Sequence, residues 1–239
     1  MNKIDKELQL SKKYYLEMVE QDENLVKLTQ DNVARVEAMI HFNSSYSGKF
    51  VEYCRKFAKV ITENEKISPD EYKDLIEKLV ISIDSENSTH LNSDGGGRVE
   101  ITNRLINIRK KDLLRYLQFP AETNYKLLRI IEEETIPKGE SEKGNKRKGR
   151  TNTSFASKFC HYTAFYLFEG KKEQDNYSIY DRILRKTIPK YAKHYGIKIK
   201  VKDLKDYCYY QQVVDEIIKK SESNISRNGF DHLIWYCYK

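Results

Sequence analysis

Long apolar runs, glycine and proline are all scarce in this sequence of 239 residues. No apolar stretch approaches the roughly 18 residues that a membrane-spanning helix requires. The first residues mix both charges and lack the apolar core of a signal peptide, so we expect a cytoplasmic protein with no membrane segment. Only ten glycines and four prolines accompany 33% charged residues, a composition typical of a soluble, helix-rich protein.

Cysteine is also scarce, and its spacing disfavours a metal centre. The four cysteines lie at Cys54, Cys160, Cys208 and Cys237 and form no C-x-x-C pair. Structural zinc and iron–sulfur clusters use closely spaced cysteine ligands. We therefore expect reduced, mostly buried thiols, with no metal and no cofactor.

Apolar residues recur with the period of an α-helix along most of the chain. This pattern predicts an all-α fold of about nine or ten helices, in which residues 197–201 form a short strand or an extended connector. Ser68 and Pro69, followed by two acids, are a strong helix start. Asp31 is the expected N-cap of the second helix. The expected helices span residues 4–18, 32–40, 49–62, 69–83, 99–117, 122–134, 156–168, 182–195, 203–220 and 229–238.

The positive charge of the chain is confined to one region. Residues 1–135 hold 21 Lys and Arg against 24 Asp and Glu, residues 136–200 hold 16 against 6, and residues 201–239 hold 6 against 6. The basic excess of the middle segment includes a dense cluster of Lys146, Arg147, Lys148 and Arg150 in a glycine-rich loop. Such a concentration favours binding to a phosphate backbone over a merely solvated basic face.

The same region divides the chain into two expected parts. Residues 1–135 form an N-terminal helical part, and residues 136–239 form a catalytic and DNA-binding part. A chain of this length can bury one core, so we expect one monomeric unit with a cleft between its parts.

Small and polar residues lead into the helix that carries Lys158. Asn152, Ser154, Ala156 and Ser157 lie just before this expected helix or at its start. A turn of small residues lets the backbone approach a phosphate, and free N–H groups at a helix start bind it. Asp181 follows Lys158 by 23 residues, at the start of the next expected helix. The alternatives are an ordinary polar helix cap for the first stretch and an N-cap for Asp181.

The stretch Ser154-Phe-Ala-Ser-Lys-Phe-Cys160 resembles the turn of the helix-hairpin-helix DNA glycosylase superfamily, and the wider sequence is similar to 8-oxoguanine-glycosylase-like bacterial proteins. The family pattern is Gly-apolar-Gly-Pro-Lys-apolar-Ala, followed about twenty residues later by a catalytic aspartate. The resemblance covers residues 136–195 and implies that Lys158 is the nucleophile and Asp181 the catalytic aspartate. Ser154 and Ala156 stand where the family has glycine, and Ser157 where it has proline.

The resemblance implies a DNA glycosylase that acts on duplex DNA containing a damaged or modified base, with or without strand nicking. In this hypothesis, Lys158 attacks C1′ of a flipped-out nucleotide and forms a Schiff base. Burial and the surrounding positive charge are expected to lower the pKa of Lys158. Asp181 stabilises positive charge that develops on the sugar.

Several alternatives stay open at this point. A non-catalytic DNA-binding protein of the same fold would account for the missing glycines. A glycosylase for phage defence would act on hypermodified bases. Water directed by Asp181 would release a base without Lys158, and a helical protein-interaction module would need neither residue. His161 is expected to be a satisfied helix residue, with a phosphate contact as the alternative. Phe230, His232 and Trp235 are expected to pack between helices, with the lining of a base pocket as the alternative.

Overall fold

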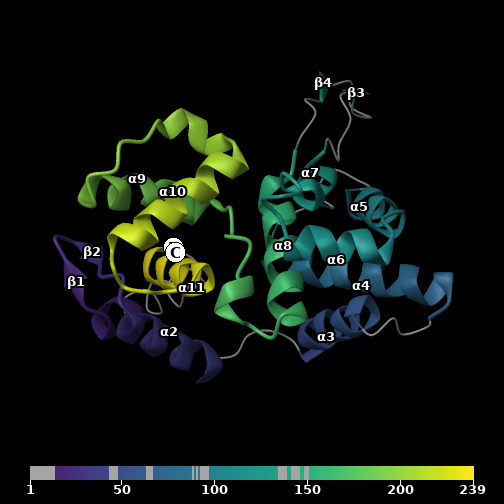
Figure 1. The fold of residues 1–239 in the computed structure, drawn as a ribbon, viewed down its shortest axis with the longest axis horizontal. Helices are drawn as coiled ribbons and strands as arrows, with labels where there is room; N and C mark the ends of the chain where they lie inside the picture. Colours follow the sequence, from purple (N-terminus) through teal and green to yellow (C-terminus); the bar gives the residue numbers. More distant parts are fainter. Residues whose placement is uncertain are drawn as a thin grey trace. The chain divides into compact units, whose positions relative to one another are not determined.

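The computed structural model is mostly helical, which confirms the all-α class (Figure 1). Its described residues are 14–42, 48–62, 67–87, 89, 91, 97–133, 139–140, 146–147 and 151–239, with only the backbone described at 40–42, 139–140 and 146–147. Strand among these residues is limited to two short hairpins, in which β1 (Gln21–Asp22) pairs with β2 (Leu25–Val26) and β3 (Gly139–Glu140) pairs with β4 (Lys146–Arg147). No helix in these ranges is long and apolar enough to cross a bilayer.

Contacts within the chain define two units, one made of two separate segments and the other of one continuous segment. The split unit combines Met1–Ser45 with Ser178–Lys239, and the inserted unit is the continuous segment Tyr46–Tyr177. This division differs from the expected boundary at residue 135. The reason is a long-range contact, since the early helix α2 (Gln30–Phe42) packs against the last helix, α11 (Arg227–Tyr238).

Helix α8 (Thr153–Leu167) is the central helix of the inserted unit. It packs against α3 (Gly48–Thr62), α4 (Pro69–Asn87), α6 (Lys110–Gln118) and α7 (Lys126–Glu132), and α5 (Gly97–Ile106) packs against α4. A short 3-10 turn, η1 (Lys172–Gln174), follows α8. A helix surrounded in this way is apolar or small on most of its faces, and eleven of the fifteen α8 residues are buried.

The expected start of α4 is confirmed in detail. The Glu71 side chain accepts a hydrogen bond from the Ser68 backbone N–H at 2.8 Å, and the Glu71 N–H donates to Ser68 Oγ at 3.2 Å. This reciprocal arrangement is a capping box. Hydrogen bonds to the Glu71 carboxyl from the Ser68 backbone, and next from its side chain, lower the pKa of this carboxyl. The helix continues to Asn87, four residues beyond the expected end.

Two expected helix boundaries in the inserted unit are wrong. The predicted helix 99–117 is divided into α5 and α6, because the N-cap Arg109 is extended (φ −61°, ψ 138°) and Asn107 Nδ2 donates back to Asn103 O at 2.7 Å. The predicted helix 122–134 begins only at Lys126, because Asn124 and Tyr125 adopt left-handed backbone angles (φ 51° and 53°).

The split unit is built around α11. This helix packs against α2, α9 (Arg182–His194), α10 (Tyr207–Lys220) and β2. Gly229 allows a close approach to α2, since a Cβ at this position would lie 2.9 Å from Val33 Cγ1. The expected N-terminal helix is described only from residue 14 and is helical to residue 18; residues 4–13 lie outside the described part.

Two elements of the split unit start elsewhere than expected, and the segment after α9 takes one of its two expected forms. Helix α2 begins at Gln30, ahead of the expected N-cap Asp31, and the Asn32 N–H donates to Thr29 Oγ1 at 3.1 Å. Residues 197–200 are an extended connector rather than a strand. The predicted helix 203–220 is a 3-10 turn, η2 (Val201–Lys205), followed by α10, whose N-cap Asp206 accepts from the Tyr209 N–H at 2.9 Å.

Candidate active site

The start of α8 forms the first part of the candidate site. Asn152 is the N-cap, and its Oδ1 accepts a hydrogen bond from the Phe155 N–H at 3.3 Å. The Thr153 hydroxyl donates to Glu132 Oε2 at 2.9 Å and so links α8 to the end of α7. The helix therefore begins three residues before the expected start at Ala156. The expected turn of small residues ahead of Lys158 is instead the first two turns of α8.

This difference changes the role of the small residues. Ala156 and Ser157 are fully buried, and the Ala156 N–H donates to Asn152 O at 3.0 Å within the helix. Asn152 is also buried, with its side chain engaged in the cap. Ser154 is half-buried. The structure thus uses Ala156 and Ser157 for packing, and we no longer assign them to a DNA contact.

Lys158 extends its side chain to the C-terminal end of α4. Only 7% of the residue is exposed, and its Nζ donates to Asn87 O at 3.3 Å. The Asn87 side chain is held in place by the Tyr162 hydroxyl, which donates to Asn87 Oδ1 at 3.0 Å. The carbonyl groups at a helix C-terminus stabilise a positive charge. The resting position of Lys158 therefore suits an ammonium group.

Asp181 is the N-cap of α9, as one of the two sequence interpretations predicted. Its Oδ1 accepts from the Leu184 N–H at 2.9 Å, and only 7% of the residue is exposed. The second carboxylate oxygen makes no hydrogen bond to any described residue. One oxygen thus supports the helix while the other remains able to face a ligand.

A second lysine, Lys239, interacts electrostatically with Asp181 and was not among the expected site residues. The ammonium of Lys239 lies 3.8 Å from the centroid of the Trp235 ring, a cation–π contact. Partial burial lowers the pKa of Lys239, whereas the negative charge of Asp181 acts in the opposite direction. The spacing of four residues between Trp235 and Lys239, one helical turn, was the available signal.

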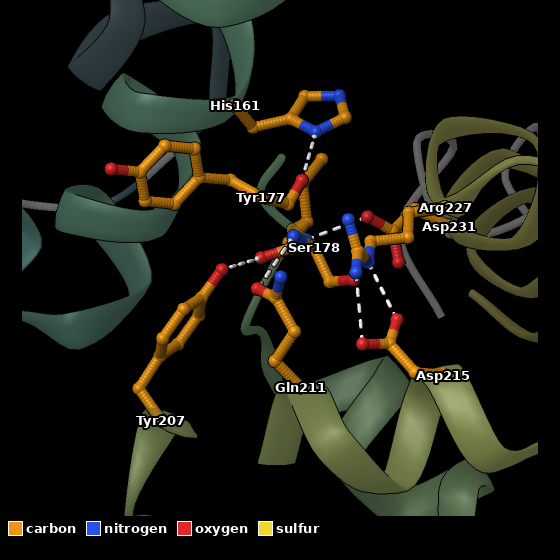
Figure 2. Close-up of polar contacts among 9 residues, drawn as sticks. His161, Tyr177, Ser178, Tyr207, Gln211, Asp215, Arg227 and Asp231 are labelled. Atoms are coloured by element: carbon orange, nitrogen blue, oxygen red, sulfur yellow. Dashed lines mark hydrogen bonds and ion pairs between the residues drawn. The ribbon is translucent and has the colours of Figure 1, made fainter. Parts of the chain in front are cut away.

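Residues 177–179 lie where the chain leaves one unit for the other, and they make polar contacts within each unit. On the inserted-unit side, the Tyr177 hydroxyl donates to Tyr116 O at 2.8 Å. His161 Nδ1 lies 2.7 Å from Tyr177 O (Figure 2). Because a carbonyl oxygen only accepts, His161 Nδ1 carries the proton. This confirms the expectation that His161 is a satisfied structural residue.

On the split-unit side, three buried polar groups hold the next two residues. The Tyr207 hydroxyl donates to Ser178 O at 2.7 Å, and the Ser178 N–H donates to Gln211 Oε1 at 3.4 Å (Figure 2). The Ile179 N–H donates to Asp231 Oδ2 at 2.6 Å. These contacts determine where the chain enters α9, and hence the position of Asp181.

A bidentate ion pair joins the two helices that contribute these hydrogen bonds, α10 and α11. Arg227 binds both carboxylate oxygens of Asp215, at 2.6 and 2.8 Å, and thereby ties the start of α11 to α10 (Figure 2). Phe230, on the same helix, is fully buried and packs edge-on against Tyr191. Half-buried His232 has its Nδ1 3.5 Å from Glu37 Oε1. Phe230 and His232 therefore serve the packing of the split unit.

The remaining expected site residues are distributed as follows. Lys158 belongs to the inserted unit and Asp181 to the split unit, and each is described in its own surroundings. Lys146 and Arg147 form β4, in register with Glu140 and Gly139. Lys148 and Arg150 lie outside the described residues.

The cysteines and the candidate metal ligands lie as follows in the described ranges. No group of three or more His, Cys, Asp or Glu side chains is arranged there to hold a metal ion. All four cysteines are free, and Cys54, Cys160 and Cys237 are buried. Burial raises the pKa of the Cys54 and Cys160 thiols and raises that of Cys237 to about 12. A thiol with a raised pKa is a poor nucleophile at neutral pH.

Comparison with known proteins yields no relative. No protein-family model matches the chain, no curated protein matches it, and no solved structure matches its fold. A functional assignment therefore depends on the side chains and charges of the chain itself.

Proposed function

We propose that this protein is a DNA glycosylase of helix-hairpin-helix type that removes a damaged or modified base from duplex DNA. The observation that carries the proposal is the burial of Lys158, which is 7% exposed on the central helix α8. Lysine is almost never buried to this degree unless a partner or a function retains it. The position of Asp181 at a helix start, 23 residues later, supports the assignment.

In the proposed reaction, the neutral amine of Lys158 attacks C1′ of a flipped-out nucleotide. The bond between C1′ and the base breaks, and the base leaves with the bonding electrons and takes up a proton. The carboxylate of Asp181 stabilises the positive charge on the sugar while this bond breaks. The nitrogen then passes one of its two protons to O4′ as the C1′–O4′ bond breaks, which gives a protonated Schiff base. Water hydrolyses this Schiff base, or loss of a C2′ proton expels the 3′ phosphate.

The attack requires Lys158 to lose a proton first. In the structure, the Asn87 carbonyl and the C-terminal end of α4 stabilise its ammonium form. We therefore expect the Lys158–Asn87 hydrogen bond to break when substrate binds. Asn87→Ala keeps the backbone carbonyl and removes the side-chain amide, which bonds to the Tyr162 hydroxyl and to Ile83 O, so this variant is expected to retain activity.

The direct test is borohydride trapping on a panel of duplexes that each carry one oxidised or hypermodified base. Wild-type protein is expected to give a covalent adduct on at least one duplex, and Lys158→Ala is expected to give none. Lys239→Gln is the matched lysine variant and is expected to retain the adduct. An adduct that persists in Lys158→Ala but is lost in Lys239→Gln would transfer the role of nucleophile to Lys239. Circular dichroism checks that each variant is folded.

A second candidate function is non-catalytic DNA binding. It is favoured by Ser154 and Ala156 in place of the glycines of the family pattern. This alternative predicts binding to duplex DNA without release of a base from any member of the panel. Base release without a trapped adduct would instead indicate water attack directed by Asp181.

A further inference from the structure

The described part of the split unit carries a concentration of positive charge that the expected DNA-contact residues do not include. Residues 182–205 contain nine Lys and Arg and a single acid, Asp203. By contrast, residues 206–239 contain four basic and five acidic residues. We use the name α9 strip for eight of these cations, all of them exposed: Arg182, Lys186, Lys190, Lys193, Lys198, Lys200, Lys202 and Lys205.

The first four cations form a row along one face of α9. Their spacing of four, four and three residues places successive side chains one helical turn apart, at about 5–6 Å. The row from Arg182 to Lys193 is about 16 Å long at the rise of an α-helix. The opposite face packs into the core through buried residues such as Leu184, Ile188 and Tyr191.

This row of cations does not stabilise α9 within the protein. Like charges one turn apart destabilise a helix, and cations in the first turn oppose the helix dipole. The first turn of α9 contains no acid after the cap, and the α9 strip makes no ion pair with a carboxylate in the described ranges. The charge is therefore available to an external anion.

The shape of the strip favours a phosphate backbone over a membrane surface. A helix that binds a bilayer inserts an apolar face among the lipids, but the apolar face of α9 is already part of the core. A linear row of exposed cations instead follows a linear row of phosphates and displaces its counterions. The strip also begins at Arg182, directly after Asp181.

We propose that the α9 strip binds the phosphate backbone of duplex DNA. The choice of duplex DNA rests on the proposed function, whereas the affinity for a phosphate backbone follows from the strip alone. The strip shares no residue with the basic cluster at 146–150, so neutralising either is expected to weaken DNA binding without abolishing it.

The test compares two variants with the same change of charge in the same unit. Lys186→Gln/Lys190→Gln removes two cations of the α9 strip, and Lys219→Gln/Lys220→Gln removes two exposed lysines at the end of α10. Binding to an unmodified fluorescent duplex is measured by anisotropy over a range of salt concentrations. We expect the strip variant to bind about tenfold more weakly near 0.1 M salt, with a log–log salt slope shallower by about 2. The α10 variant should match wild type.

The proposal is overturned if the two variants bind alike, or if an RNA duplex of the same sequence binds more tightly than DNA. It is also overturned if anionic vesicles compete with the duplex more effectively than unlabelled DNA does. Single-turnover base release at saturating protein separates this result from the proposed function. A strip variant that binds weakly yet releases the base at the wild-type rate supports both proposals. A strip variant that binds as tightly as the α10 variant, while the wild-type protein releases the base, contradicts only this one.

Discussion

Asp181 has a structural and a proposed chemical role, and two substitutions separate them. Asn is as good an N-cap as Asp, whereas Ala caps poorly. We expect Asp181→Ala to lower the free energy of unfolding by about 0.5–2 kcal/mol and Asp181→Asn to leave it nearly unchanged. If the carboxylate stabilises the sugar cation, both variants lose base release. Urea unfolding and abasic-site formation measure the two effects. Full activity in Asp181→Asn would mean that Asp181 serves only as the N-cap of α9.

Tyr72 offers a test of a buried polar atom. Its hydroxyl is buried in α4 without a hydrogen-bond partner in the described part of the chain, and burial raises its pKa to about 12. Removing an unsatisfied hydroxyl while keeping the ring removes a desolvation penalty. We expect Tyr72→Phe to raise the free energy of unfolding by up to about 1 kcal/mol. The matched control is Tyr207→Phe, which loses the hydrogen bond to Ser178 O and should be destabilised.

Local sequence identified some of the site but not its surroundings. The cap at Asp181 follows from residue type and position alone, and the structure confirms it. The contact of Lys158 with Asn87 joins residues 71 positions apart, and no local periodicity reveals such a contact. The same limit applies to Lys239 beside Asp181.

At the scale of helices, capping chemistry was the more reliable guide. Ser68 and Glu71 marked the start of α4, and the structure contains the capping box. Apolar periodicity alone joined α5 and α6, because the interruption at residues 107–109 does not disturb the apolar spacing. The start of α8 was placed too late because its cap, Asn152, precedes small residues that resemble a turn but are buried by the surrounding helices.

The close contact of α2 and α11 predicts a specific sensitivity. In Gly229→Ala, the new Cβ would lie 2.9 Å from Val33 Cγ1. Such overpacking typically costs about 1–3 kcal/mol, so we expect a corresponding loss of stability in urea unfolding. Adding Val33→Ala should recover part of it. Gly48→Ala, where no atom lies within 4 Å of the new Cβ, is the control. Equal effects at the two glycines would contradict a steric cause.

For the whole molecule, buried phenols and thiols predict alkaline sensitivity. Burial raises the pKa of Tyr177, Tyr191 and Tyr210, and that of Cys237 to about 12. The folded state then holds these protons more tightly than the unfolded state. Their contribution is complete below about pH 8.5 and is lost as pH rises through the thiol and phenol range toward 12. Urea midpoints at pH 8 and pH 10.5 should show this loss. An unchanged midpoint would mean that these side chains are solvated.

The split unit also has a consequence for how the chain is made. Helix α2 ends at Phe42 and its partner α11 begins at Arg227, 185 residues later (227 − 42). At about 5–20 residues per second, a ribosome needs about 10–40 s to synthesise that interval. The inserted unit is continuous and is synthesised before α11. The apolar face of α2, by contrast, stays without its partner until α11 has been synthesised. A message truncated before α11 would therefore release a chain whose inserted unit is folded but whose α2 lacks its packing partner. Proteases and chaperones recognise such exposed apolar surface.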